Sequence, residues 1–420
     1  MNETRKTGKG SIFAALGPGI LFAGAAIGVS HLVQSTRAGA GWGFDLLWVV
    51  LLIMICKYPF FQFAHRYTVA TGQSLLQGYR QLGSWALGLF MLVVVVSSFI
   101  TLAAVTIVTA GLAGTLLGLE ISLVVLSLWL LLIVAGILGL GHYRFLDTGM
   151  KVMVVILATL TVAAVAVAAG HGPAGDTSWP RPDLWTVTGL SFLLALMGWM
   201  PAPLDVGVWP SLWILEKHRG KKSLPTMRQV MMDFHLGYIG TGVLAVAFVS
   251  FGALLMFGTG KEFSPSGLAF SRQLVEMYTE TLGGWSRWII ALVAFITMFS
   301  TTLTVLDGYA RTLGGGFALL RGRSAVADSR SYLLFMPLLI GIALAVITFF
   351  MGSMKVLVDL ATIMAFLTAP LVAMLNFKVV RSAQVPKEHR PGRALSALSW
   401  VGIVFLSGFS LFWIWLRWLA

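Results

Sequence analysis

Long apolar runs recur along this chain from Ile12 to its last residue, and they leave no room for a sizeable soluble domain. A run of roughly 20 mainly apolar residues can cross a bilayer as a helix. Charged residues make up only 11% of the 420 residues, against roughly 25% in soluble domains. The sequence therefore predicts an all-α membrane protein with one transmembrane domain, residues 1–420. We expect spans at 12–36, 44–66, 86–116, 122–141, 150–170, 186–213, 235–258, 285–310, 331–351, 355–378 and 396–419.

The basic residues alternate from loop to loop, as membrane topology requires. Of the 29 Lys and Arg residues, 21 fall in the N-terminal tail or in the loops that follow even-numbered spans. Cytoplasmic loops carry such an excess, so we expect a cytoplasmic N-terminus and an external C-terminus in a bacterial-type inner membrane. The net charge of +13 therefore does not indicate a nucleic-acid partner. The single cysteine, Cys56, rules out an intrachain disulfide.

Two predicted spans carry residues that interrupt a helix near its middle. The first contains the small-residue stretch 24–31, and the sixth contains Pro201 and Pro203. Proline removes a backbone donor, and transporters often place broken helices at matching positions of two inverted repeats. Ordinary kinks are the alternative interpretation. Because the breaks lie five spans apart, we favour inverted repeats at 12–170 and 186–378, with 396–419 as an extra peripheral helix.

The segment from Gly17 to Val49 resembles the start of the natural-resistance-associated macrophage protein (NRAMP) family of metal transporters. The resemblance rests on the opening Gly17-Pro18-Gly19, on the Gly-rich exit that leads to Leu46-Leu47-Trp48, and on Met200-Pro201 in the sixth span. It implies a LeuT-type fold of five plus five helices, with helices 1 and 6 broken. It also implies alternating access, proton coupling and a divalent metal ion as substrate.

The sequence departs from this family at the metal motif. The family's Asp-Pro-Gly-Asn is replaced by Gly28-Val29-Ser30-His31, and the His of its Met-Pro-His motif is replaced by Ala202. Met200 keeps the thioether, and Thr368 takes the place of a polar Gln. The resemblance implies a substrate site formed by Gly28, Ser30, His31, Met200, Ala202, Asp205 and Thr368, in which Met200, His31 and Asp205 are the candidate metal ligands.

Ionisable residues inside a membrane are costly and are usually functional or paired. His31 could ligate a metal, carry a proton, or simply bond a carbonyl group. Asp205 could ligate a cation or cap the second half of a broken helix. Lys57 could carry a proton, act as a counter-ion or pair with an Asp, and its charge would repel a divalent metal. Asp307 and Arg311, four residues apart, could form an intrahelical pair or a gate.

Hydroxyl groups and one further carboxylate add weaker candidates. The hydroxyls of residues 300–304 could bond their own helix or line a sodium or proton site. Asp359 could belong to an outer gate or to the membrane interface.

No enzymatic constellation is present: the sequence lacks a His-Glu-x-x-His motif and a phosphate-binding loop, and we expect no cofactor. We therefore expect a proton-coupled secondary transporter of a divalent ion, of manganese or magnesium type, with an altered site. The alternative is a transporter of a small organic solute on the same fold, with the metal site lost. A non-transporting membrane sensor is less favoured, because no soluble output domain is visible. The expected partners are membrane lipid and a small ion or solute.

Overall fold

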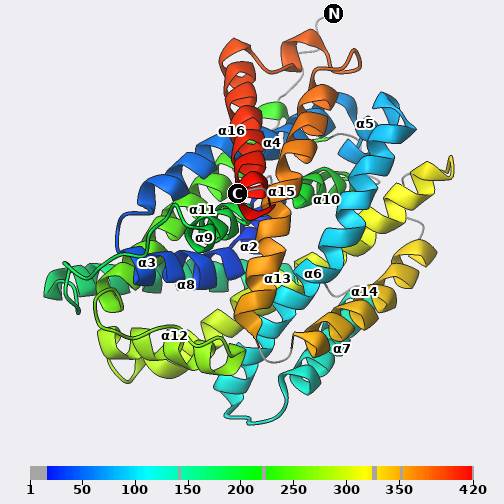
Figure 1. Ribbon diagram of the computed structural model, residues 1–420. Coiled ribbons are helices and arrows are strands. Elements are labelled where there is room, and N and C mark those ends of the chain that lie inside the picture. Colours follow the sequence, from blue (N-terminus) through cyan, green and yellow to red (C-terminus); the bar gives the residue numbers. More distant parts are fainter. Residues whose placement is uncertain (1–16, 141–142, 220–223, 324–328, 351–352, 419–420) are drawn as a thin grey trace, which may run out of the picture.

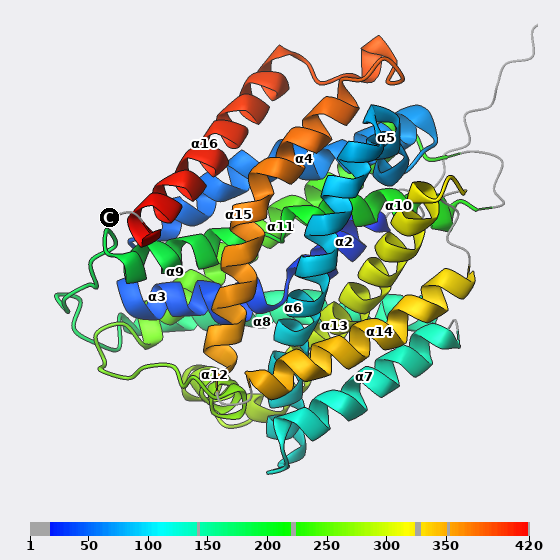
Figure 2. The ribbon, with the colours of Figure 1, turned by 45° about the vertical axis from the view of Figure 1, so that its right-hand side comes forward.

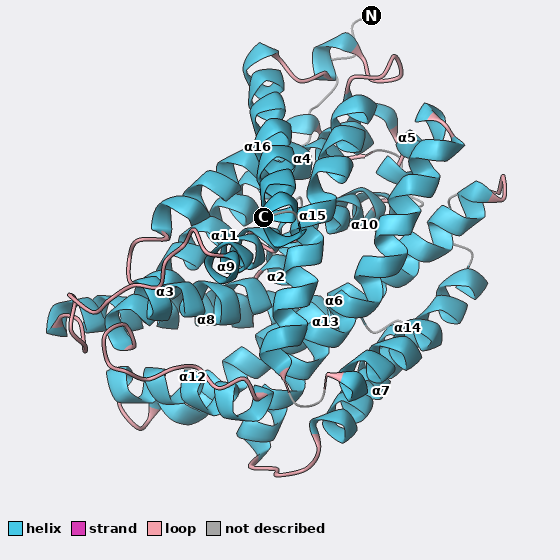
Figure 3. Ribbon diagram, viewed as in Figure 1, coloured by secondary structure: helices cyan, strands magenta, loops and turns pink. Residues whose placement is uncertain are grey.

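The computed structural model describes residues 17–140, 143–219, 224–323, 329–350 and 353–418. Within these residues the chain forms helices and loops only (Figure 3). The N-terminal basic tail and the first residues of the first predicted span lie outside the described residues. The predicted all-α membrane fold is confirmed.

Nine unbroken helices correspond to predicted spans. They are α4 (Leu47–Thr71), α6 (Ser84–Leu117), α7 (Leu123–Gly139), α8 (Tyr143–His171), α11 (Met227–Leu255), α13 (Ser286–Leu320), α14 (Ser329–Phe349), α15 (Met354–Val380) and α16 (Arg393–Trp418). Among the described residues, seven helices are long and apolar enough to cross a membrane by themselves. The helices α7 and α9 are shorter apolar segments, as is the described apolar part of α8.

The first and sixth predicted spans are both broken. The first consists of α2 (Pro18–Ala26), a π-helical segment η1 (Ser30–Ser35) and α3 (Thr36–Trp42). The sixth consists of α9 (Val187–Gly198), a 3₁₀ segment η2 (Leu204–Val208) and α10 (Trp209–Lys217). Prolines 201 and 203 lie in the gap of the sixth span, where a missing backbone donor costs no helical bond. Both predicted breaks are therefore present.

Two short helices were not expected from the sequence. They are α5 (Leu75–Leu82), which begins with a capping box between Ser74 and Gln77, and α12 (Gly267–Leu282). Both are too short and too polar to read as spans. The helix α13 also continues ten residues beyond the predicted end of its span, so Arg311 lies in the same helix as Asp307.

Helix α11 packs against both halves of the first broken helix (Figures 1 and 2). Glycine makes this approach possible, because a Cβ atom at Gly237 would lie 2.4 Å from the Gly19 carbonyl oxygen. A Cβ atom at Gly252 would lie 2.2 Å from the Thr36 carbonyl oxygen. Small residues commonly allow such close helix contacts in membranes. In the same core α13 packs along α6, and α15 packs against α9, so these helices surround the two breaks.

Candidate functional site

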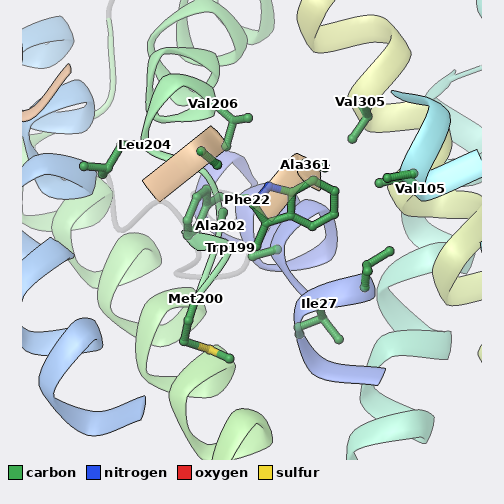
Figure 4. Packing of buried hydrophobic residues seen from close by; sticks show 14 of the residues in the cluster. Phe22, Ile27, Val105, Trp199, Met200, Ala202, Leu204, Val206, Val305 and Ala361 are labelled. Atoms are coloured by element: carbon green, nitrogen blue, oxygen red, sulfur yellow. The ribbon is translucent and has the colours of Figure 1, made fainter. Parts of the chain in front are cut away.

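A small cavity of about 30 Å³ lies where the two broken helices meet. This volume is enough for only one or two water molecules. It is lined by Ala25, Ala26, Val29, Ser30, Thr101, Val105, Trp199, Pro201, Ala202, Pro203, Val206, Trp209, Thr301 and Val305. Figure 4 shows the Trp199 indole at the centre, with Val105 of α6 and Val305 of α13 to one side. Within the lining there is no acidic side chain.

Hydroxyl groups lie within hydrogen-bond distance of carbonyl oxygens at the first break. The Ser30 hydroxyl lies 2.8 Å from the Ala26 carbonyl oxygen and 3.4 Å from that of Pro201, so it connects the two breaks. The Thr301 hydroxyl of α13 lies 3.2 Å from the Gly24 carbonyl oxygen at the end of α2. Helix ends buried away from water need such partners, and hydroxyls supply them here.

His31 is completely buried and is directed toward α11. Its Nε2 atom lies 3.0 Å from the Thr241 carbonyl oxygen, so Nε2 carries a hydrogen and donates it. Its Nδ1 atom lies 2.8 Å from the Ser30 hydroxyl, whose single hydrogen is donated either to Nδ1 or to the Ala26 carbonyl oxygen. Both ring nitrogens are therefore engaged, and His31 does not line the cavity.

Lys57 of α4 lies at the end of α9 and not at an acidic partner. Its side chain is completely buried, and Nζ donates to the carbonyl oxygens of Met197 at 2.7 Å, Gly198 at 2.7 Å and Ala202 at 3.3 Å. The last carbonyls of a helix lack intrahelical partners and form its negative end. An ammonium group satisfies both requirements at once.

Asp205 lies in the first turn of η2, on the other side of the second break. Its Oδ2 atom accepts hydrogen bonds from Ser97 at 2.7 Å and from Tyr309 at 2.9 Å. Its Oδ1 atom has no partner among the described residues. In the described part of the chain, Lys57 and Asp205 do not form an ion pair. The cation lies at a helix C-terminus and the anion at a helix N-terminus, which is the favourable arrangement for both helix dipoles.

The remaining predicted site residues are spread around the cavity. Met200 is buried but does not line the cavity, and in Figure 4 it lies on the opposite side of the Trp199 indole from Val105. Thr368 bonds the Met364 carbonyl oxygen of its own helix at 3.0 Å and is not part of the lining. Gly28 faces α13, and a Cβ atom there would meet the Thr301 side chain at 2.9 Å.

The donor set around the cavity contains few metal ligands. Within the described ranges, no group of three or more His, Cys, Asp or Glu side chains is placed to hold a metal ion. Ala202 contributes a backbone carbonyl, but Lys57 occupies it.

Two tryptophans at the site were not predicted from the sequence. Trp199 and Trp209 line the cavity and are 3% and 1% exposed. Their indole Nε1 atoms donate to no protein atom among the described residues. A buried donor without a partner is costly, so such a group is a candidate for binding a ligand. The only sequence signal was a tryptophan placed next to the Met-Pro interruption.

A larger cavity, which we call the vestibule, has a volume of about 520 Å³ and shares no lining residue with the small one. At its edge Arg37 of α3 forms two hydrogen bonds with Asp359 of α15, at 2.6 and 3.1 Å. Gln34 accepts from Arg37 at 2.9 Å and donates to Asp359 at 3.0 Å. This network ties the second half of broken helix 1 to α15.

A second network ties the second half of broken helix 6 to α13 and α14. Asp307 accepts from Arg311 at 2.9 Å, from Tyr332 at 2.9 Å and from the Trp213 indole at 3.3 Å. Asp307 is 4% exposed and Arg311 is 28% exposed. Figure 2 shows α10 and α3 at opposite ends of the bundle, so the two networks lie on opposite sides of the breaks. The predicted pairing of Asp307 with Arg311 is present.

We expect Asp307→Ala to lower the free energy of unfolding by about 2 kcal/mol, because three donors lose one buried charged acceptor. Thermal unfolding of the purified protein in detergent checks this value. Glu216→Ala is the matched control, since its ion pair with Arg219 spans 3.8 Å and is half-exposed. Such exposed pairs contribute roughly 0–1 kcal/mol. Equal losses in the two variants would contradict the stabilising role of Asp307.

Within the described residues, seven helices able to cross a membrane surround two broken helices that meet at a buried cavity, and this arrangement is that of a LeuT-type membrane transporter. Residues 19–416 match the family model "Natural resistance-associated macrophage protein-like" (Nramp). The chain belongs to the Nramp family, whose members are transporters and not enzymes.

Relatives and solved structures agree with this assignment. The chain is 37% identical over 409 residues to the uncharacterized protein PM0681 of Pasteurella multocida, covering 96% of this chain and 92% of that one. It is 25% identical over 261 residues to the divalent metal cation transporter MntH of Levilactobacillus brevis, covering 59% and 55% of the two chains.

Two solved structures share the fold. The manganese transporter of Eremococcus coleocola superposes with a TM-score of 0.71 at 13% identity, covering 98% of this chain and 88% of that one. MhsT in complex with L-phenylalanine superposes with a TM-score of 0.66 at 11% identity, covering 95% and 98%. The shared fold therefore includes both a manganese transporter and a protein that binds an amino acid.

Proposed function

We propose that this chain is an alternating-access secondary transporter of a small organic solute that carries a hydrogen-bond acceptor and no net positive charge. The observation that carries the proposal is the composition of the cavity between the breaks. Among the described residues, the indole N–H donors of its lining residues Trp199 and Trp209 have no partner, and the Lys57 ammonium contacts the carbonyl of the lining residue Ala202.

The indole groups favour an acceptor. An indole N–H is a donor only, so it can bind a carboxylate or amide oxygen but cannot ligate a cation. Both indoles lie in a nearly dry site, where an unmet donor costs about 1–3 kcal/mol. A solute oxygen that accepts from either indole would remove that cost.

The charges at the breaks disfavour a divalent ion. Lys57 contacts the carbonyl of Ala202, which itself lines the cavity. At an effective dielectric constant of about 20, a divalent ion about 5 Å from an ammonium group is repelled by about 7 kcal/mol. Asp205 offsets part of this repulsion: its Oδ2 atom is bonded to Ser97 and Tyr309, and its Oδ1 atom has no partner among the described residues. No carboxylate lines the cavity to compensate further.

In this proposal, the small volume of the cavity corresponds to a closed state of the transporter. A cavity of about 30 Å³ does not hold an organic solute, so the site must widen when one side opens. We propose that the repeats 12–170 and 186–378 move against each other, with the N-terminus in the cytoplasm and the C-terminus outside the inner membrane. Proton coupling is assigned to His31, the titratable side chain at the first break.

Uptake into proteoliposomes with an imposed pH gradient tests the proposal. The panel comprises small monocarboxylates, small amides and zwitterionic amino acids, with Mn²⁺ in parallel. We expect saturable uptake of one organic class and none of Mn²⁺. Trp199→Phe keeps the ring and removes the donor, so it should raise KM about 10-fold. Trp185→Phe, at a position 71% exposed, is the matched control.

A divalent metal ion is the second candidate substrate. It is favoured by the family assignment and by Met200, whose thioether lies within the second break. In that case Met200, His31 and Asp205 would be the ligands, after His31 releases Thr241. Saturable Mn²⁺ uptake that is lost in Met200→Ala and His31→Ala, but kept in Trp199→Phe, would favour this candidate over the organic solute.

A further inference from the structure

We propose that the Lys57 ammonium group is a tethered cation, held in a cation site that the carbonyl oxygens of Met197, Gly198 and Ala202 build at the second break. Removing the side chain should open this site to a free organic ammonium ion. The inference concerns a binding site and does not depend on which solute the protein transports.

The geometry of the site matches an ammonium ion. The two shortest Nζ–oxygen distances are both 2.7 Å, within the range of about 2.7–2.9 Å for charged N–H···O bonds. Magnesium–oxygen distances are shorter, about 2.1 Å. The three acceptors also equal the three hydrogens of an ammonium group. All the donors of Lys57 can therefore be satisfied by carbonyls of one broken helix.

The site depends on the break. Met197 and Gly198 end α9, so their carbonyl oxygens lack the partner four residues on that a helix would supply, although the Met197 carbonyl oxygen also accepts from the backbone amides of Trp199 and Met200. Ala202 lies within the interruption, and its carbonyl faces the same ammonium group. A continuous helix would have used these oxygens for its own hydrogen bonds. The interruption therefore creates a negative pocket, which Lys57 fills from α4.

Neither solvent nor a directly contacting carboxylate of the described residues holds the charge of Lys57. The side chain is completely buried, so its charge does not reach solvent or a lipid headgroup. In the described residues it forms no ion pair with Asp205, whose Oδ2 atom is bonded to Ser97 and Tyr309. The three carbonyl oxygens are its hydrogen-bond partners, and the Asp205 carboxylate adds a favourable charge interaction across the break.

Chemical rescue of Lys57→Ala tests the inference. Alanine keeps Cβ, so propylammonium replaces the three missing methylene carbons and the amino group. We expect the detergent-purified variant to unfold several degrees below the unmodified protein. Millimolar propylammonium should recover at least half of that loss, whereas propan-1-ol, which has the same length and no charge, should not. Lys387→Ala, at an exposed position, should show neither the loss nor the recovery.

The variant Lys57→Met separates the effect of the charge from the effect of the side-chain volume. It fills most of the same space without a cation, so we expect lower stability and no response to propylammonium. If Lys57→Ala does not fold, its folded yield during expression with propylammonium or propan-1-ol gives the same comparison. Equal effects of amine and alcohol, or no effect of the amine, would overturn the proposal. The assay contains neither solute nor gradient, so failed transport would not bear on it.

Discussion

Of all variants that add one methyl group at the site, Gly198→Ala is expected to lower the free energy of unfolding most. A Cβ atom at Gly198 would lie 1.8 Å from the Thr362 carbonyl oxygen of α15, where backbone atoms have little freedom to move. Overpacking of a buried contact costs about 1–3 kcal/mol, and more when backbone must shift. We expect a loss of about 3 kcal/mol or more, measured by thermal unfolding and by the folded yield in detergent.

This expectation has a site-specific consequence. The Gly198 carbonyl oxygen accepts from Lys57, so displacing α9 also disturbs the ammonium contacts. Gly341→Ala in α14 is the matched control, because its Cβ atom would meet nothing within 4 Å. Alanine is also the better helix former there. If Gly198→Ala were as stable as Gly341→Ala, the result would contradict the close contact of α9 with α15 at Gly198.

Asp359→Asn is expected to open a path between the vestibule and the small cavity, which share no lining residue in this structure. The variant leaves the Arg37 guanidinium, 10% exposed, without its carboxylate partner, and it frees α3 from α15. A loss of about 1.4 kcal/mol shifts such an equilibrium tenfold. We therefore expect a cysteine at the cavity position Val29 to react about 10-fold faster with a small methanethiosulfonate in detergent.

The chain is well suited to this measurement, because its single native cysteine, Cys56, is buried. Asp45→Asn is the matched control. It removes an ion pair of the same 2.6 Å length, with Arg181, but the two side chains are 41% and 50% exposed. Exposed pairs contribute roughly 0–1 kcal/mol, so the reaction rate should hardly change. An unchanged rate in Asp359→Asn would mean that the Arg37–Asp359 pair does not hold the path closed.

Much of the architecture was predictable because it depends on local chemistry. An apolar run long enough to span a bilayer forms a helix whatever its neighbours are. Proline at 201 and 203 interrupts a helix through its own missing donor. Asp307 and Arg311 pair because helical residues four apart face each other. By contrast, α12 was missed because its amphipathic sequence lacks the apolar length on which the span prediction relied.

The site itself was only partly predictable. The sequence indicated that His31, Lys57 and Asp205 lie near the breaks, but each had several plausible partners. Their actual partners are far away in sequence: Lys57 bonds Met197, 140 residues later, and His31 bonds Thr241, 210 residues later. Sequence periodicity does not report which of several distant carbonyls a side chain will reach.

By itself the sequence determined a membrane protein with eleven spans, two of them interrupted, because hydrophobic length and proline act within one segment. Only the tertiary structure decided what the interruptions contain. It directed His31 away from the cavity, placed the Lys57 ammonium on three carbonyl oxygens, and left two indole donors at the cavity without partners. The physical reason is that a buried polar group takes the partner that helix packing brings within reach, and that packing joins segments far apart along the chain.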